Sequence, residues 1–173
     1  AFMPLATLGL LFGKNIKAGV VGTNGGVPAT RAVVAQADLV LFIGCRAGST
    51  TTEHGQMPGR NVTILHIDVD AMTIGTNYRT DVGMVGDARL ALEALDAAVQ
   101  PLMGRRPALT SDGRALAAQA RLEKLAFFEP LAQSNEQPIR PERVLASLNR
   151  LLPKRAIAVA DPGTPCPYFS AYF

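Results

Sequence analysis

The chain has 173 residues, a formal net charge of +3 and 48% hydrophobic residues, which is typical of a folded globular protein and excludes a disordered one. Its basic residues are scattered, without the basic runs and interleaved aromatic residues of nucleic-acid-binding proteins, so we expect no nucleic-acid partner. Neither Cys45 nor Cys166 belongs to a CxxC or Cys/His cluster. This argues against a structural metal site and suits a reducing, cytoplasmic location.

The first twelve residues, AFMPLATLGLLF, are apolar but too few to span a bilayer, and Pro4 interrupts them. They also lack the basic start of a signal peptide, so we expect neither a membrane span nor a secretory leader. The chain begins without Met inside this apolar run. We therefore expect a fragment of a longer protein whose start lies upstream.

Apolar runs and helical periodicity predict an alternation of helices and strands. In chain order the predicted elements are a weak strand at 2–8, a helix at 28–36, strands at 38–45 and 62–68, a weak strand at 83–85, helices at 87–103, 111–131 and 141–152, and a strand at 156–161. The three strong strands are continuous apolar runs, as in parallel strands buried on both faces. This order predicts an α/β fold, a parallel sheet with helices on both faces.

Several local signals support the helix predictions. Asp87 is a predicted N-cap, and Leu92, Leu95 and Val99 recur at helical spacing after it. The helix at 141–152 starts with Pro and carries one stripe of apolar residues, namely Val144, Leu145, Leu148, Leu151 and Leu152. Polar, Pro- and Gly-bearing segments at 104–113 and 133–141 predict a linker around the helix at 111–131.

Ligands of open parallel sheets lie at the carboxyl ends of the strands, so the residues after each strand are the candidate site. Gly44 and Arg46 follow the first strong strand, and a guanidinium there is suited to a phosphate. The alternative is that Arg46 pairs with a loop acid such as Glu53. Asp68 ends the second strong strand, where it is placed to accept ribose hydroxyls. Alternatively, Asp68 and Asp70 only cap the turn that follows.

A glycine-rich turn with Gly22, Gly25 and Gly26 precedes the helix at 28–36. Backbone amides at such a helix start attract anions. The alternative, which we favour, is that these glycines only make a tight turn. His66 lies inside a predicted strand and is expected to be a buried histidine with hydrogen-bond partners, and Cys45 a small buried hydrophobic residue. No nucleophile with a local base and no metal-ligand spacing is found.

Three segments resemble a known family in their order and spacing: GGVPATRAVVAQADLVLFIGCR, ILHIDVDAMTIGTNYRTDVGMVGDARLALEAL and IRPERVLASLNRLLPKRAIAVADPG. Together they resemble thiamine diphosphate-dependent enzymes of the acetolactate synthase, pyruvate oxidase and benzoylformate decarboxylase group. The resemblance implies a Rossmann-like, three-layer central domain with a six-stranded parallel sheet, truncated at its N-terminus. It implies a central domain at 1–103, a linker with a helix at 104–140, and the start of the diphosphate-binding domain at 141–173.

The resemblance also implies a function for the parent enzyme, namely decarboxylation or carboligation of a 2-oxo acid with thiamine diphosphate and Mg²⁺. The family's metal-binding motif and its activating glutamate lie outside this chain, so the chain alone is expected to be inactive. Family members form dimers or tetramers. The implied partners are therefore the missing domains and further copies of the chain. Two other hypotheses stay open: a stand-alone module that binds FAD, ADP or NAD, and a purely structural scaffold.

The cofactor-contacting positions that match the family's loops are Gly25, Gly26, Gly44, Arg46, Asp68, Asp87, Gly163 and Thr164. Two departures from the family pattern limit what they imply. Thr164-Pro165 stands where acetolactate synthases carry a Gln-His pair. Arg46 is followed by Ala47-Gly48-Ser49-Thr50 in place of an aromatic residue and an acidic-basic run, which argues against FAD.

Overall fold

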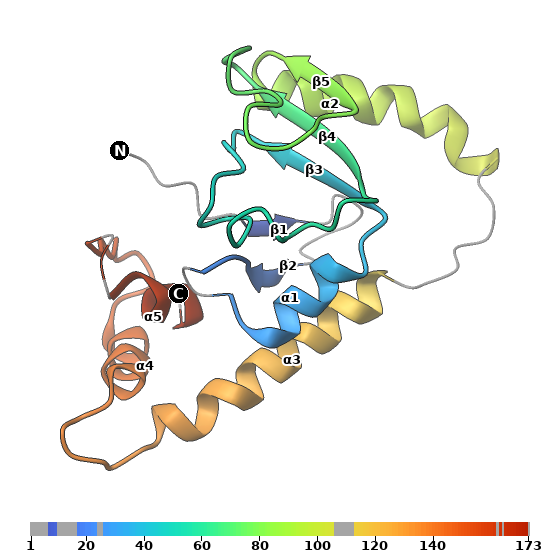
Figure 1. Ribbon diagram of the computed structural model, residues 1–173. Coiled ribbons are helices and arrows are strands. Elements are labelled where there is room, and N and C mark those ends of the chain that lie inside the picture. Colours follow the sequence, from blue (N-terminus) through green and yellow to red (C-terminus); the bar gives the residue numbers. More distant parts are fainter. Residues whose placement is uncertain are drawn as a thin grey trace. The chain divides into compact units, whose positions relative to one another are not determined.

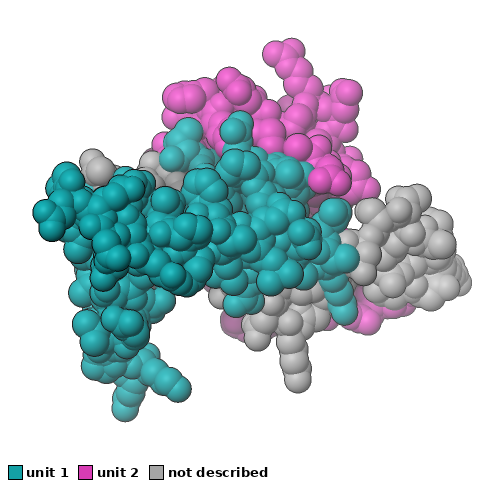
Figure 2. All heavy atoms as spheres, turned by 90° about the horizontal axis from the view of Figure 1, so that it is seen from below, with its two compact units in different colours: residues 1–34, 114–173 teal, residues 35–113 magenta. Residues whose placement is uncertain are grey.

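A computed structural model describes residues 7–9, 17–23, 26–105, 113–161, 163 and 165–172. The chain divides into two compact units, Ala35–Gly113 on the one hand and Ala1–Val34 with Arg114–Phe173 on the other (Figure 2). Each unit is described by itself below.

The unit at Ala35–Gly113 is built on a parallel sheet of three strands in the order β3-β4-β5 (Figure 1). The strands are β3 (Leu39–Ile43), β4 (Thr63–Asp68) and β5 (Val82–Val85), followed by helix α2 (Ala88–Val99) and the 3₁₀ helix η1 (Gln100–Arg105). Phe42 lies opposite His66, and His66 opposite Gly83. The predicted strands at 38–45, 62–68 and 83–85 are thus confirmed, as is the α/β fold class.

Buried side chains lie on both faces of this sheet, because Ile64 and His66 point to one face and Ile67 to the other. Phe42, Cys45, Ala47 and Ile64 form a buried cluster, and the half-buried ring of Tyr78 packs against it. Helix α2 contacts β4, and its predicted stripe of Leu92, Leu95 and Val99 is half-buried. As β4 has a strand on each side, it is the best-covered element of the sheet.

The other unit contains a two-stranded antiparallel sheet, β1 (Thr7–Gly9) with β2 (Lys17–Val20). The resemblance implies a six-stranded parallel sheet for the complete central domain of the family, and the described residues of this chain hold three parallel strands. The pairing of β1 with β2 is antiparallel because the connection between them is short. Only residues 10–16 join β1 to β2, and a parallel pair needs a crossover of about a dozen residues or more.

Four helices belong to this unit: α1 (Pro28–Ala35), α3 (Gly113–Ala132), α4 (Pro141–Leu151) and α5 (Pro165–Tyr172). The first three lie close to the helices predicted at 28–36, 111–131 and 141–152. A small buried core joins β2, α1 and α3 through Ala18, Ala117 and Ala120, with Ala29 and Val33 packed against them. Of the predicted apolar stripe of α4, only Leu145 is buried.

The predicted strand at 156–161 is wrong. These residues form no strand, and Ile157 and Val159 are 91% and 87% exposed. A strand of the buried parallel type is stable only when neighbouring strands pair with it and helices cover its faces. No described strand pairs with this segment.

Candidate functional site

The carboxyl ends of β3, β4 and β5 bring four of the predicted site residues to one edge of the sheet. Pairing continues past the strand ends, because the Gly44 amide donates to Ile67 O at 2.9 Å and the Gly86 amide donates to Asp68 O at 2.9 Å. Residues that directly follow the strands therefore share this edge. They are Gly44, Arg46, Asp68 and Asp87, and we call this group the carboxyl edge.

Gly44 has a φ of +55°, in the left-handed region where side chains are disfavoured. No atom lies within 4 Å of the place that a Cβ would take. The backbone conformation thus favours a glycine, which leaves open space at the strand end.

Arg46 is exposed, and its guanidinium has no acidic partner among the described residues. The alternative of an Arg46–Glu53 pair is therefore wrong. The backbone of Arg46 is fixed instead, because Asn77 Nδ2 donates to Arg46 O at 2.7 Å. This bond joins the loop after β3 to the loop after β4 and leaves the guanidinium available to a ligand.

Asp68 and Asp70 both stabilise the turn that follows β4. Asp68 Oδ1 accepts the amide of Asp70 at 2.9 Å, and Asp70 Oδ1 accepts the amide of Met72 at 2.9 Å. The capping role predicted for Asp70 is confirmed. Asp68 is half-buried, and its Oδ2 has no further hydrogen bond within the described part of the chain. One oxygen therefore belongs to the turn and the other is open to a ligand.

Asp87 is the N-cap of α2, as predicted. Its Oδ1 accepts the amide of Leu90 at 3.1 Å, and its backbone is extended. This bond satisfies one of the amides that a helix start leaves without a partner. The role of Asp87 in the structure is thus local, and a ligand at this edge would meet only its second oxygen.

The glycine-rich turn before α1 is closed on itself. The Gly26 amide donates to Gly22 O at 3.0 Å, and a Cβ on Gly26 would lie 2.4 Å from that oxygen. Thr30 is fully buried, accepts the Val27 amide at 3.1 Å and donates to Val20 O at 2.8 Å. This geometry supports the tight-turn interpretation for Gly26. Gly25 lies outside the described residues.

The last candidate position lies near the C-terminus, in the same unit as Gly26. The Gly163 amide donates to Asp161 Oδ1 at 3.1 Å, and both residues are exposed. The Gly163 amide is thus already bound by a carboxylate of its own turn. Thr164 lies outside the described residues.

His66 is buried as predicted, at 1% exposure, but the expectation of hydrogen-bond partners is wrong. Neither ring nitrogen has a partner among the described residues. Its neighbour in the sheet is apolar, since the Phe42 ring meets the imidazole edge to face at 5.8 Å. Cys45 is buried in the core cluster, as predicted.

Two residues that the sequence interpretation passed over fix the connections around β4. Tyr78 joins the β4–β5 connection to the β3–β4 connection, and Asp81 binds the amino end of β4, away from the carboxyl edge. The Tyr78 hydroxyl donates to Pro58 O at 3.0 Å, and burial raises the pKa of that hydroxyl. Asp81 Oδ2 accepts the amide of Ile64 at 2.9 Å, and this bond, followed by the contact with Arg79, lowers the pKa of the Asp81 carboxyl. The only sequence signal for these contacts was that polar residues stand just before the short strand β5.

Within the described ranges, no group of three or more His, Cys, Asp or Glu side chains is placed to hold a metal ion. None of the helices seen there combines the length and the apolar character needed to cross a membrane.

Comparison with known proteins places the chain in a family. Residues 5–95 match the profile of the thiamine pyrophosphate enzyme central domain. A probable acetolactate synthase large subunit of Methanocaldococcus jannaschii is 32% identical over 78% of this chain and 21% of its own length. Acetolactate synthase isozyme 3 large subunit of Escherichia coli is 27% identical, over 90% of this chain and 26% of its own length. A probable sulfoacetaldehyde acetyltransferase of Rhizobium meliloti is 25% identical, over 91% and 29%. The chain thus spans about a quarter of the length of these relatives.

Proposed function

This chain belongs to the thiamine pyrophosphate enzymes, and from that premise we propose that it is the non-catalytic central part of an acetolactate synthase-like enzyme acting on a 2-oxo acid. The observation that carries the proposal is the match of residues 5–95 to the family's central domain, together with the acetolactate synthase relatives. We further propose that the enzyme works in the cytoplasm as a homodimer or homotetramer.

Similarity extends beyond the central domain, since several relatives match 90% or more of the chain. This supports the proposed organisation: a central domain at 1–103, a linker with a helix at 104–140 and the start of a diphosphate-binding domain at 141–173. The helical linker agrees with α3, which lies between the polar segments at 104–113 and 133–141.

Thiamine diphosphate, which supplies a carbanion for attack on a 2-oxo acid, is the cofactor we propose for the whole enzyme, with Mg²⁺. The described residues near Gly163 do not fit its diphosphate by themselves, because the Asp161 carboxylate already binds the Gly163 amide and would repel a diphosphate. We therefore propose that other parts of the enzyme hold the cofactor and derive no catalytic step from this chain.

The carboxyl edge fits part of an adenine nucleotide. Asp68 Oδ2 is available to ribose hydroxyls, the Arg46 guanidinium to a phosphate, and Gly44 leaves open space between them. We propose that this edge binds ADP, because the residues after Arg46 argue against FAD. The first alternative is a scaffold domain that binds no ligand of its own. The second is a stand-alone nucleotide-binding module, whose ligand would bind at the same edge.

A thermal-shift experiment on the 173-residue chain separates these alternatives, with ADP, FAD, NAD, and thiamine diphosphate with Mg²⁺ as ligands. A ligand at a hundredfold excess over its dissociation constant stabilises the folded state by about 2.7 kcal/mol. If the edge is a site, ADP raises the Tm, and Asp68→Ala and Arg46→Ala abolish the shift. Arg60→Ala, an exposed arginine on the β3–β4 connection, is the matched control and keeps the shift.

No shift with any nucleotide supports the scaffold. A shift that survives both edge variants overturns the assignment of the site. The non-catalytic role has its own test, since purified chain incubated with pyruvate, thiamine diphosphate and Mg²⁺ is expected to form no acetolactate. Turnover by the chain alone would overturn it.

A further inference from the structure

One hydrogen bond at the carboxyl edge joins the two loops that carry Arg46 and Asp68. Asn77 lies in the loop after β4, and its Nδ2 donates to Arg46 O at 2.7 Å. The two residues are 31 positions apart in the chain. The bond is therefore a contact between loops and not a part of either turn.

The loop after β4 connects Asn77 to Asp68 through a series of short-range hydrogen bonds. Asp68 accepts the amide of Asp70, as described above. The Thr73 amide then donates to Asp70 O at 3.0 Å, and the Thr76 amide donates to Thr73 O at 3.3 Å. The place of Asn77 is thus set by the end of β4, where Asp68 stands.

Arg46 stands between two residues that the core holds. Cys45 and Ala47 are 6% and 2% exposed and belong to the buried cluster on the sheet, whereas Arg46 is exposed. The Ala47 amide also donates to Cys45 Sγ at 3.4 Å. The core therefore fixes the chain on both sides of Arg46, and Asn77 fixes the oxygen of the peptide group between Arg46 and Ala47.

That peptide group is held in a disfavoured conformation. Ala47 has a φ of +47°, in the left-handed region where a residue with a side chain persists only if its surroundings keep it there. The free energy of one hydrogen bond is of the same size as the cost of this conformation. Loss of the bond from Asn77 would therefore let the peptide group turn and release the loop after β3 from the loop after β4.

We infer that Asn77 is a positioning residue of the carboxyl edge, which holds Arg46 at a fixed place relative to Asp68. One nucleotide then meets a phosphate-binding and a ribose-binding group that are already correctly spaced, and no ordering of Arg46 has to accompany binding. Asn77 acts through Arg46 and not by contact with the nucleotide. This inference rests on the proposed ADP site.

The test is a calorimetric titration of the 173-residue chain with ADP and with adenosine, which has the base and the ribose but no phosphate. Asn77→Ala is expected to weaken ADP binding by about fivefold to tenfold, because Arg46 must then be ordered on binding, and to leave adenosine binding unchanged. In an Arg46→Ala background, Asn77→Ala is expected to have no further effect on ADP binding, since the two residues act as one unit.

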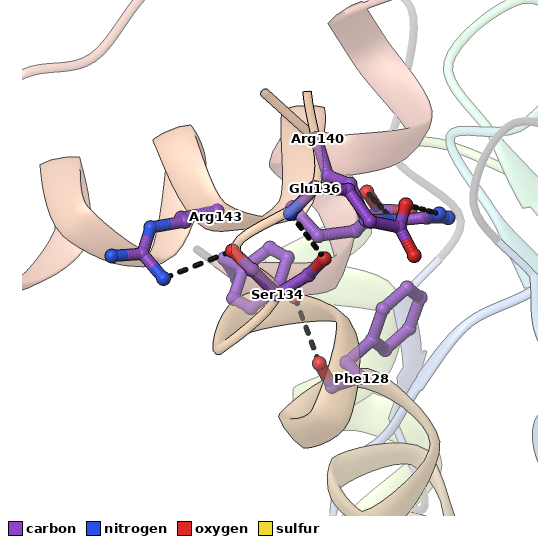
Figure 3. Close-up of polar contacts among 7 residues, drawn as sticks. Phe128, Ser134, Glu136, Arg140 and Arg143 are labelled. Atoms are coloured by element: carbon purple, nitrogen blue, oxygen red, sulfur yellow. Dashed lines mark hydrogen bonds and ion pairs between the residues drawn. The ribbon is translucent and has the colours of Figure 1, made fainter. Parts of the chain in front are cut away.

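Two controls separate positioning from stability. Asn61→Ala removes an exposed asparagine on the β3–β4 connection and is expected to keep both affinities. Arg143→Ala breaks a bridge of similar chemistry in the other unit, where the guanidinium donates to Gln133 O at 3.1 Å and, as Figure 3 shows, to Ser134 O at 2.9 Å. Arg143→Ala is expected to lower the Tm and to leave the ADP affinity unchanged.

The outcomes distinguish a failure of this inference from a failure of the proposed site. An unchanged ADP affinity in Asn77→Ala, an equal loss for ADP and adenosine, or a further loss in the Arg46→Ala background would overturn the positioning role and leave the nucleotide site standing. Absence of ADP binding by the original chain would overturn both. Circular dichroism checks that every variant is folded.

Discussion

Two apolar runs of this chain, β4 (Thr63–Asp68) and the segment at 156–161, look alike in sequence but differ in structure. Each is a short, mostly apolar series that ends on an aspartate, TILHID in β4 and AIAVAD at 156–161. Ile67 in β4 is fully buried, whereas Ile157 is 91% exposed. The difference lies in the neighbours, because β4 pairs with β3 and β5, and the segment at 156–161 pairs with no described strand. An apolar run therefore shows that a segment is suited to a buried strand. Whether the strand forms depends on partner strands that pair with it.

The largest expected effect comes from the same substitution in both runs. Ile67→Ala removes a fully buried side chain and is expected to lower the free energy of unfolding by about 4 kcal/mol, through lost burial and the cavity left behind. Ile157→Ala changes an exposed side chain and is expected to alter it by less than about 0.5 kcal/mol. Urea unfolding followed by circular dichroism measures both. Equal losses would show that the segment at 156–161 is packed as tightly as β4.

The same comparison explains how far the sequence could predict the fold. The strands β3, β4 and β5 and the helices α1, α2, α3 and α4 were predicted because their signals are local: apolar runs, helical stripes and caps such as Asp87. The pairing of β1 with β2 and the exposure of Ile157 were missed, because pairing depends on connection length and on which other strands are present. A single segment of sequence carries no signal for such non-local contacts.

For the candidate site, the sequence predicted positions and local capping bonds. Gly44, Arg46 and Asp68 were placed at strand ends by the rule that parallel strands share their carboxyl ends, and Asp87 was predicted as the N-cap of α2. The tight turn at Gly26 was predicted because its glycines are a local signal. The open Arg46 guanidinium was not, because it depends on where the loops after β3 and β4 meet, which the sequence does not encode locally.

A smaller effect is expected from substituting His66. It tests whether the buried polar atoms of β4 have hydrogen-bond partners. Both ring nitrogens lack a partner among the described residues, and an unsatisfied buried polar group costs about 1–3 kcal/mol. His66→Leu keeps the volume, removes the polar atoms and is expected to raise the free energy of unfolding by about 1 kcal/mol. Urea unfolding at pH 7 gives this difference.

The control for that variant is His66→Gln, which keeps polar atoms at the same place and is expected to give no gain. A clear loss of stability in His66→Leu would mean that the imidazole makes hydrogen bonds in solution, for example to a buried water. β4 would then owe part of its stability to a polar contact that the segment at 156–161 lacks.

The smallest expected effect is at Asp81, which extends the pairing of β4 beyond the ends of β5. Asp81 accepts the Ile64 amide through its carboxylate at 2.9 Å and donates its own amide to Ile64 O at 2.8 Å. The first of these bonds, followed by the contact with Arg79, lowers the pKa of the carboxyl below its ordinary value of 3.8. Asp81→Asn keeps an acceptor but loses the charge, so a modest decrease in Tm is expected at pH 7.

The sign of the pH dependence follows from the direction of that shift. Because the folded pKa is the lower one, the carboxylate stabilises the fold fully above its unfolded pKa of about 3.9, and this contribution is lost as the pH falls through the folded pKa. The Tm difference between the original chain and Asp81→Asn should therefore be constant from pH 7 to 5 and close below pH 4. Asp96→Asn, an exposed acid on α2 away from β4, is the control. A difference that does not narrow between pH 5 and pH 3 would mean that the side chain acts through its shape rather than its charge.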